Sequence, residues 1–229
     1  MRCAFALQTL EYTAVFGRPL FSLARRQAEL AETWFEKTAA ALPVDLADMQ
    51  AIGGTTYADV AVILRLPRLR GALEVRVDRI HGRFDGAPLR EDLDSATAAV
   101  EMCIQAVNEV FPDVRVASTS VVVHSWLDCG GDKHGVETLL ASRQQVQFDP
   151  LAVGAEVVRF VARGQLTNES EAWSLAFGLE PSLLPGYDLY LISQATYEAG
   201  SLYGSVETRW AHVREAGPKV LHQFGFEVF

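Results

Sequence analysis

Apolar and polar residues alternate with a period of two along several stretches of the chain, which is the pattern of strands buried on one face. In the segment 72–78, Leu73, Val75 and Val77 share one face, and charged residues occupy the other. After this segment the alternation shifts by one position, which predicts a bulge or a turn near Arg79. We expect strands at 3–14, 59–66, 72–78, 114–127, 156–166, 172–180 and 187–197.

Three other stretches repeat apolar residues every three or four positions, as amphipathic helices do. They cover 20–42, 91–111 and 206–224. Proline follows directly after the first two and ends them, and the Gly217-Pro218 step predicts a kink or a division in the third. Runs of strands separated by single helices indicate an α+β fold and not a parallel α/β sheet.

We therefore expect a curved antiparallel sheet packed against long helices. Each helix has one apolar stripe and each strand has one apolar face, so packing the sheet against the helices buries both. The order of elements suggests two loosely similar α+β halves, 1–135 and 136–229, packed as one globular unit. This architecture is of the TATA-binding-protein-like or helix-grip-like kind.

The composition is that of an ordinary globular protein, because 49% of the 229 residues are hydrophobic and 21% are charged. The formal net charge is −9. An acidic chain has no general attraction for phosphates, so nucleic acid is an unlikely partner.

The sequence also predicts a cytoplasmic location. It contains no run of about 18 apolar residues that could cross a membrane, and its first residues, MRCAFALQTLEYTAV, do not have the pattern of a signal peptide. Cys3, Cys103 and Cys129 are odd in number and show no CxxC spacing. We expect them to be reduced thiols.

Histidines, cysteine and aspartates gather in the stretch VVVHSWLDCGGDKHGV, residues 121–136. His124, Cys129 and His134 are weak candidates for zinc ligands. However, their spacing is not a recurrent one, a strand would place the first two on opposite faces, and Lys133 is a poor neighbour for a cation. The DCGGD segment is typical of a turn. We expect a strand that runs into a polar turn, with no metal or other cofactor and no catalytic residue.

A second candidate is a group of six arginines within nineteen positions, with only two acidic residues among them. Their planar guanidinium groups could bind an anion or an acidic partner through paired hydrogen bonds. Alternatively, they form a solvated or self-paired face, for example through Arg76 and Asp78. The six are Arg65, Arg68, Arg70, Arg76, Arg79 and Arg83.

Aromatic residues are frequent late in the chain. Tyr190 shares a strand face with Ile192 and Gln194, a mixed surface that suits a pocket or a subunit interface. The terminal FGFEVF is unusually apolar for a chain end. We expect it to dock either on its own sheet or on a partner.

The common enzyme motifs GxxxxGK[ST], GxGxxG, GxSxG and HExxH do not occur. We therefore expect a non-catalytic binding or assembly protein that acts through the arginine-rich face and the aromatic C-terminal surface, with a protein partner or as a homo-oligomer. The alternative is a small-ligand binder or enzyme with a cavity between sheet and helix, lined by His124, Trp126 and Tyr190. A third is a metal-dependent enzyme that uses residues 124–134.

Two longer stretches carry a family resemblance. LEVRVDRIHGRFDG followed by a helix and a strand, and YDLYLISQATYEAG followed by a helix with LHQFGF, resemble a sporadically distributed family of uncharacterised bacterial proteins. The resemblance covers about 60–229 and implies a bacterial source and a duplicated α+β architecture, with no known activity. The long strand departs from that family, which tends to carry an Arg and an Asn where this chain has Ser120, His124 and Ser125.

Overall fold

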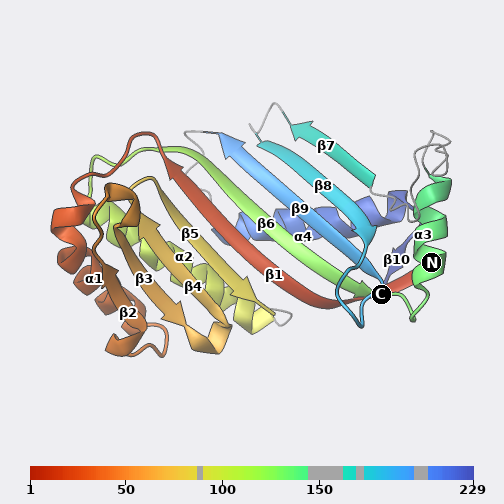
Figure 1. The fold of residues 1–229 in the computed structure, drawn as a ribbon, viewed down its shortest axis with the longest axis horizontal. Helices are drawn as coiled ribbons and strands as arrows, with labels where there is room; N and C mark the ends of the chain where they lie inside the picture. The colour runs from red at the N-terminus through yellow and green to blue at the C-terminus, as the bar shows by residue number, and fades with distance from the viewer. Residues whose placement is uncertain (87–89, 144–161, 169–172, 199–205) are drawn as a thin grey trace.

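A large sheet forms the centre of the computed structural model, which describes residues 1–86, 90–143, 162–168, 173–198 and 206–229 (Figure 1). Its strands are β1 (Arg2–Phe16), β2 (Met49–Ile52), β3 (Ala61–Leu66), β4 (Gly71–Arg76), β5 (Arg79–Asp85), β6 (Val116–Asp128), β7 (Ala162–Asn168), β8 (Trp173–Pro181), β9 (Leu189–Glu198) and β10 (Glu227–Val228). The α-helices are α1 (Leu23–Ala39), α2 (Arg90–Val110), α3 (Lys133–Ser142) and α4 (Val206–Gln223).

The sheet is arranged about its two longest strands, β1 and β6, which pair antiparallel at its centre. The order is β2-β3-β4-β5-β1-β6-β9-β8-β7, and β10 pairs with β1 in parallel. Strand, helix, strands and helix therefore follow one another twice, from β1 to α2 and from β6 to α4. This confirms the α+β fold with an antiparallel sheet and two loosely similar halves. We call the elements from β1 to α2 the first series and those from β6 to α4 the second series. The strand β6 begins the second series, whereas the predicted division after residue 135 places it in the first half.

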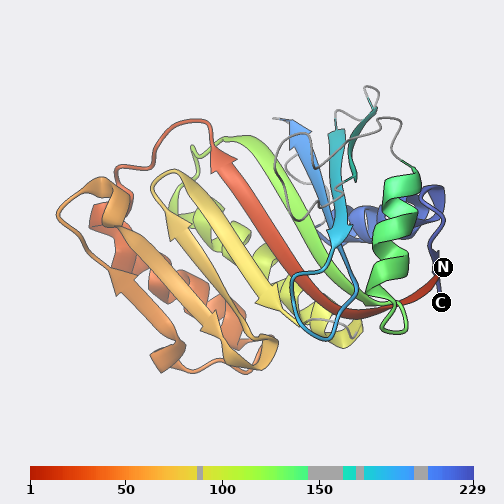
Figure 2. The ribbon, with the colours of Figure 1, turned by 45° about the vertical axis from the view of Figure 1, so that its right-hand side comes forward.

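The helices α2 and α4 lie on the same face of the sheet, and Figure 2 shows the strong twist between its first and last strands. Alternate residues of β1 and β6, such as Tyr12 and Val121, enter the core beneath these helices. Trp210 of α4 is fully buried and meets the ring of Phe84 of β5 edge to face, with 6.0 Å between ring centroids. This contact joins the two series of elements into one core.

A second buried cluster fills the end of the sheet where β1 begins and β6 ends. Because Ala4 lies opposite Asp128 in the antiparallel pairing, Cys3 comes beside Cys129, and the two form a disulfide. The prediction of three reduced thiols is therefore wrong for these two. Cys103 is free and buried, and its burial raises the pKa of the thiol.

The C-terminal segment docks on the protein's own sheet, as one of the two predicted arrangements requires. Phe226 is fully buried in the second cluster, and Glu227 and Val228 form β10 beside Arg2 and Cys3. Phe229, at 83% exposure, remains in solvent.

The elements differ from the predicted ones mainly where they are short. The shift near Arg79 is a tight turn between β4 and β5, and α3, β2 and β10 are too short to have been recognised by periodicity. The helix α4 continues through Gly217 and Pro218, so of the two predicted outcomes, a kink or a division, the division is wrong. Gly217 is buried against the side chain of Leu191 of β9, so the side of α4 that carries Gly217 packs on the sheet. Residues 156–161 of one predicted strand lie outside the described residues.

None of the described helices combines the length and the apolar character that crossing a membrane requires.

Candidate functional site

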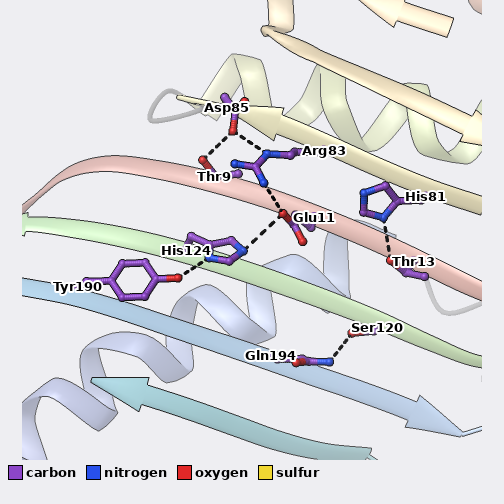
Figure 3. Close-up of polar contacts among 10 residues, drawn as sticks. All are labelled: Thr9, Glu11, Thr13, His81, Arg83, Asp85, Ser120, His124, Tyr190 and Gln194. Carbon is purple, nitrogen blue, oxygen red and sulfur yellow. Dashed lines mark hydrogen bonds and ion pairs between the residues drawn. The ribbon is translucent and has the colours of Figure 1, made fainter. Parts of the chain in front are cut away.

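The face of the sheet turned away from α2 and α4 carries polar and aromatic side chains from four neighbouring strands (Figure 3). We call it the open face. Successive residues of a strand point to opposite faces, so burying Val121 and Val123 in the core brings His124 to this side. The open-face residues of the central strands include Thr9, Glu11, Thr13, His81, Arg83, Asp85, Ser120, His124, Trp126, Tyr190 and Gln194.

His124 lies at the centre of this face and joins two strands. Its Nδ1 is 2.6 Å from the hydroxyl oxygen of Tyr190 on β9, and its Nε2 is 3.5 Å from Oε1 of Glu11 on β1. A carboxylate only accepts hydrogen bonds, so a neutral imidazole places its proton on Nε2, toward Glu11. Nδ1 then accepts the hydrogen bond that the Tyr190 hydroxyl donates.

Partial burial affects the protonation of both His124 and Tyr190. Burial lowers the pKa of His124, against the opposing effect of the Glu11 carboxylate. Burial also raises the pKa of Tyr190, with further contributions from Glu180 and Glu11. The histidine is therefore held neutral and the tyrosine protonated, which matches the hydrogen bond between them.

Three rings form one aromatic patch on the open face. Trp126 and Tyr190 lie directly opposite each other on β6 and β9, with ring centroids 5.2 Å apart. The ring of His124 lies 6.3 Å from Trp126 and 6.1 Å from Tyr190, close to parallel with both. We call these three side chains the ring patch.

Beside the ring patch, Arg83 of β5 binds two carboxylates. Its Nη1 lies 3.0 Å from Oε1 of Glu11, and its Nε lies 3.1 Å from Oδ1 of Asp85. Thr9 donates a further hydrogen bond of 3.0 Å to Asp85. The guanidinium is half exposed, so these contacts orient it without removing it from solvent.

Self-pairing accounts for half of the predicted arginine-rich face. Arg76 pairs with Glu74 at 3.0 Å, and Arg79 pairs with Asp78 at 3.2 Å, in addition to the pairs of Arg83. The hydrogen bond that Arg76 donates to Glu74 raises the pKa of the Arg76 guanidinium. The other three arginines of this group are Arg65, Arg68 and Arg70, which lie on β3 or in the turn after it. Within the described ranges, none of them has a carboxylate within ion-pair distance.

The structure does not bring the weak metal candidates together. The sulfur of Cys129 is in the disulfide, His124 points to the open face, and His134 is exposed on α3. No cluster of three metal-binding side chains occurs among residues that the structure describes. The predicted turn is present instead: Gly130 and Gly131 have φ of 80° and 74°, a conformation that glycine adopts without strain.

One residue important for this turn had no recognisable signal in the sequence. Asp188, just before β9, is buried, and its Oδ2 accepts hydrogen bonds from the backbone N–H groups of Cys129 and Gly131, at 2.8 and 3.0 Å. It therefore holds the turn after β6 against β9.

The predicted cavity residues His124, Trp126 and Tyr190 do come together, but not between sheet and helix. Their expected position is wrong because the parity of β6 and β9 turns them to the open face. Two hollows, of about 500 and 540 Å³, lie on the other side of the sheet along α4. A Tyr–His–Glu chain can relay a proton, and in the described part of the chain these three side chains lie on the open face of the sheet.

Replacing His124 is expected to reduce the loss of stability in mild acid. The unfolded chain protonates this histidine near its ordinary pKa of 6.5, and the folded protein does so only at lower pH. Protonation therefore favours unfolding as the pH falls below 6.5. We expect the urea midpoint to fall less between pH 7.5 and 5.0 in His124→Asn than in the wild type. His134→Asn, at an exposed site, is the control and should follow the wild type. Equal losses in all three proteins would show that His124 is not the source.

The comparisons with known proteins indicate no activity for this chain. No family model and no curated protein matches the chain. Among solved structures the chain is similar to Methanococcus jannaschii TBP, with 11% identity, coverage of 98% of this chain and 99% of that chain, and a TM-score of 0.37. The resemblance to uncharacterised bacterial proteins stays a prediction.

Proposed function

We propose that this protein is a non-catalytic binding protein that recognises a protein partner across the open face of its sheet. The observation that carries the proposal is the ring patch, three adjacent rings on the face of the sheet opposite α2 and α4. Trp and Tyr are enriched among residues that dominate binding energies, because they offer a large apolar area together with a polar group.

The polar surroundings of the ring patch support the same proposal. Arg83 stands beside it, held in place by Glu11 and Asp85. Protein interfaces commonly combine an aromatic centre with oriented arginines and a polar rim. In this proposal, the arginine-rich face predicted from the sequence contributes through Arg83. The aromatic surface that binds the partner is the ring patch, and not the C-terminal segment.

Charge favours a protein over nucleic acid as the partner. Three of the six arginines are neutralised by neighbouring carboxylates, and the whole chain carries a net charge of −9. Neutralising phosphates requires cations that are free to replace counterions. A second copy of the chain is the other protein that this face could recognise, which would make the protein a homo-oligomer.

The cytoplasmic location is a prediction that has lost one of its supports. Reduced thiols were expected there, but Cys3 and Cys129 form a disulfide, and disulfides persist mainly in oxidising compartments.

Truncating the ring patch is expected to weaken partner binding without unfolding the protein. Trp126→Ala and Tyr190→Ala should each cost about 2 kcal/mol of binding, or roughly 30-fold in Kd. The measurement needs a partner, which a photo-crosslinking amino acid at Gln194 on the open face can capture in cells. The control is the same amino acid at Leu46, which is 71% exposed and lies in the turn before the edge strand β2, four strands from β1 in the sheet order.

The expected result is a discrete adduct from Gln194 and none from Leu46, lost when Trp126→Ala is added. An adduct of twice the chain mass would identify a second copy as the partner. Equal labelling from both positions, or an adduct that survives the loss of Trp126, would contradict the proposal.

A further inference from the structure

The larger of the two hollows is a groove on the helix side of the sheet, between α4 and β8, with a volume of about 540 Å³. One wall is a stripe along α4 and the other consists of side chains of β8. Small-molecule sites commonly have volumes in this range. The lining residues used below are Trp173, Phe177, His212, Ala216, Lys219 and Phe224.

Comparing the two series of elements explains why the groove is there. In the first, α1 has 17 residues, packs along α2 and also contacts β2 and β3. In the second, the corresponding helix α3 has only 10 residues, and it buries Val136 and Leu140 in the cluster at the end of the sheet. Among the described residues, α3 therefore reaches only the end of α4, where Val220 and Leu221 enter the same cluster.

The walls of the groove are mostly aromatic. Phe177 of β8 and Phe224 after α4 meet edge to face, with ring centroids 6.1 Å apart. Trp173 and His212 meet in the same way at 4.4 Å. Between these two pairs lies the small side chain of Ala216, which leaves the middle of the groove open.

The charge at the rim is positive. Lys219 is exposed and has no ion-pair partner within the part of the chain that the structure describes. The described lining residues include no Asp or Glu. Glu215, on the same helix, lines the other hollow, beside Arg214. An acidic protein thus presents an apolar groove with an isolated ammonium group at its edge.

We propose that this groove binds an amphipathic monocarboxylate with a single apolar chain. Its apolar chain would lie against Trp173, Phe177 and Phe224, where it loses contact with water. Its carboxylate would remain at the rim beside Lys219, where both charges stay hydrated. The proposal concerns a different surface from the open face and does not depend on the proposed function.

Titration calorimetry of the full chain with decanoate, below its micelle concentration, tests the proposal. We expect saturable binding of one decanoate per chain. Lys219→Met keeps the apolar stem and removes the charge, so it should weaken decanoate binding about threefold, as expected for an exposed ion pair, and leave the binding of decanol unchanged. Lys133→Met, on α3, makes the same change in net charge outside the groove and should have no effect.

A second variant fills the groove. Ala216→Phe should reduce the binding of both decanoate and decanol at least tenfold while the thermal unfolding midpoint stays near that of the wild type. If this variant unfolds, labelling of the wild-type protein with a diazirine derivative of decanoate, mapped by mass spectrometry, locates the site independently.

Labelling confined to α4 and β8 supports the proposal. Absence of saturable binding, labelling elsewhere, or equal affinity for decanoate in the wild type and Lys219→Met would overturn it.

Discussion

Removing the Cys3–Cys129 disulfide is expected to lower the free energy of unfolding by about 4 kcal/mol. The two cysteines are 126 residues apart, so the disulfide closes more than half of the chain into a loop. A cross-link restricts the unfolded chain more than the folded one, and for a loop of this size the entropy alone accounts for about 5 kcal/mol at most. Both cysteines are also buried in the cluster at the end of the sheet.

The measurement is guanidinium denaturation with and without reductant, alongside the double variant Cys3→Ala, Cys129→Ala. The double variant should be destabilised to the same extent and should not respond to reductant, which separates loss of the disulfide from other effects of the reagent. Thiol titration of the denatured wild type should find one free thiol, that of Cys103. Finding three would show that the disulfide is absent from the protein as isolated, and would restore the argument for a cytoplasmic location.

Trp210→Ala is expected to lower the free energy of unfolding by about 4 kcal/mol. Trp210 is fully buried beneath α4 and packs edge to face on Phe84 of β5. The substitution removes a large apolar side chain and leaves a cavity, and both contribute to the loss. Because this contact joins elements of both series, we expect a single unfolding transition at a lower midpoint, and not two separate transitions.

Phe21→Ala is the matched control for this prediction. Phe21 is 56% exposed, and its ring contact is with Tyr57, which is also exposed, so its loss should cost less than about 1 kcal/mol. Urea denaturation followed by circular dichroism measures both variants. A cost for Trp210→Ala as small as that of Phe21→Ala would show that the packing of α4 on β5 does not hold the two series together.

The long elements could be predicted from the sequence because their signals are local. The stripe that contains Leu23, Leu30, Trp34 and Thr38 is the buried side of α1, and the alternation of β6 and β9 determines which residues share a face. The short elements had no such signal. α3 spans 10 residues, and β2 and β10 span four and two, too few for a period to be distinguished.

The candidate site could also be predicted only as far as local sequence signals reach. The sequence placed His124 and Trp126 on one face of their strand, and Tyr190 on one face of another, and the structure agrees. Which side of the sheet these faces occupy depends on where α2 and α4 pack. The contact of His124 with Glu11 also could not be foreseen, because it joins positions more than a hundred residues apart.

The sequence by itself therefore determined the long strands and helices, and that sheet and helices cover each other, since these follow from the spacing of apolar residues along the chain. Only the tertiary structure decided that β1 lies beside β6, that Cys3 meets Cys129, and that the ring patch faces away from the helices. The physical reason is that strand pairing is made by backbone hydrogen bonds, which are the same for every residue. The choice of neighbour therefore depends on the packing of the whole chain.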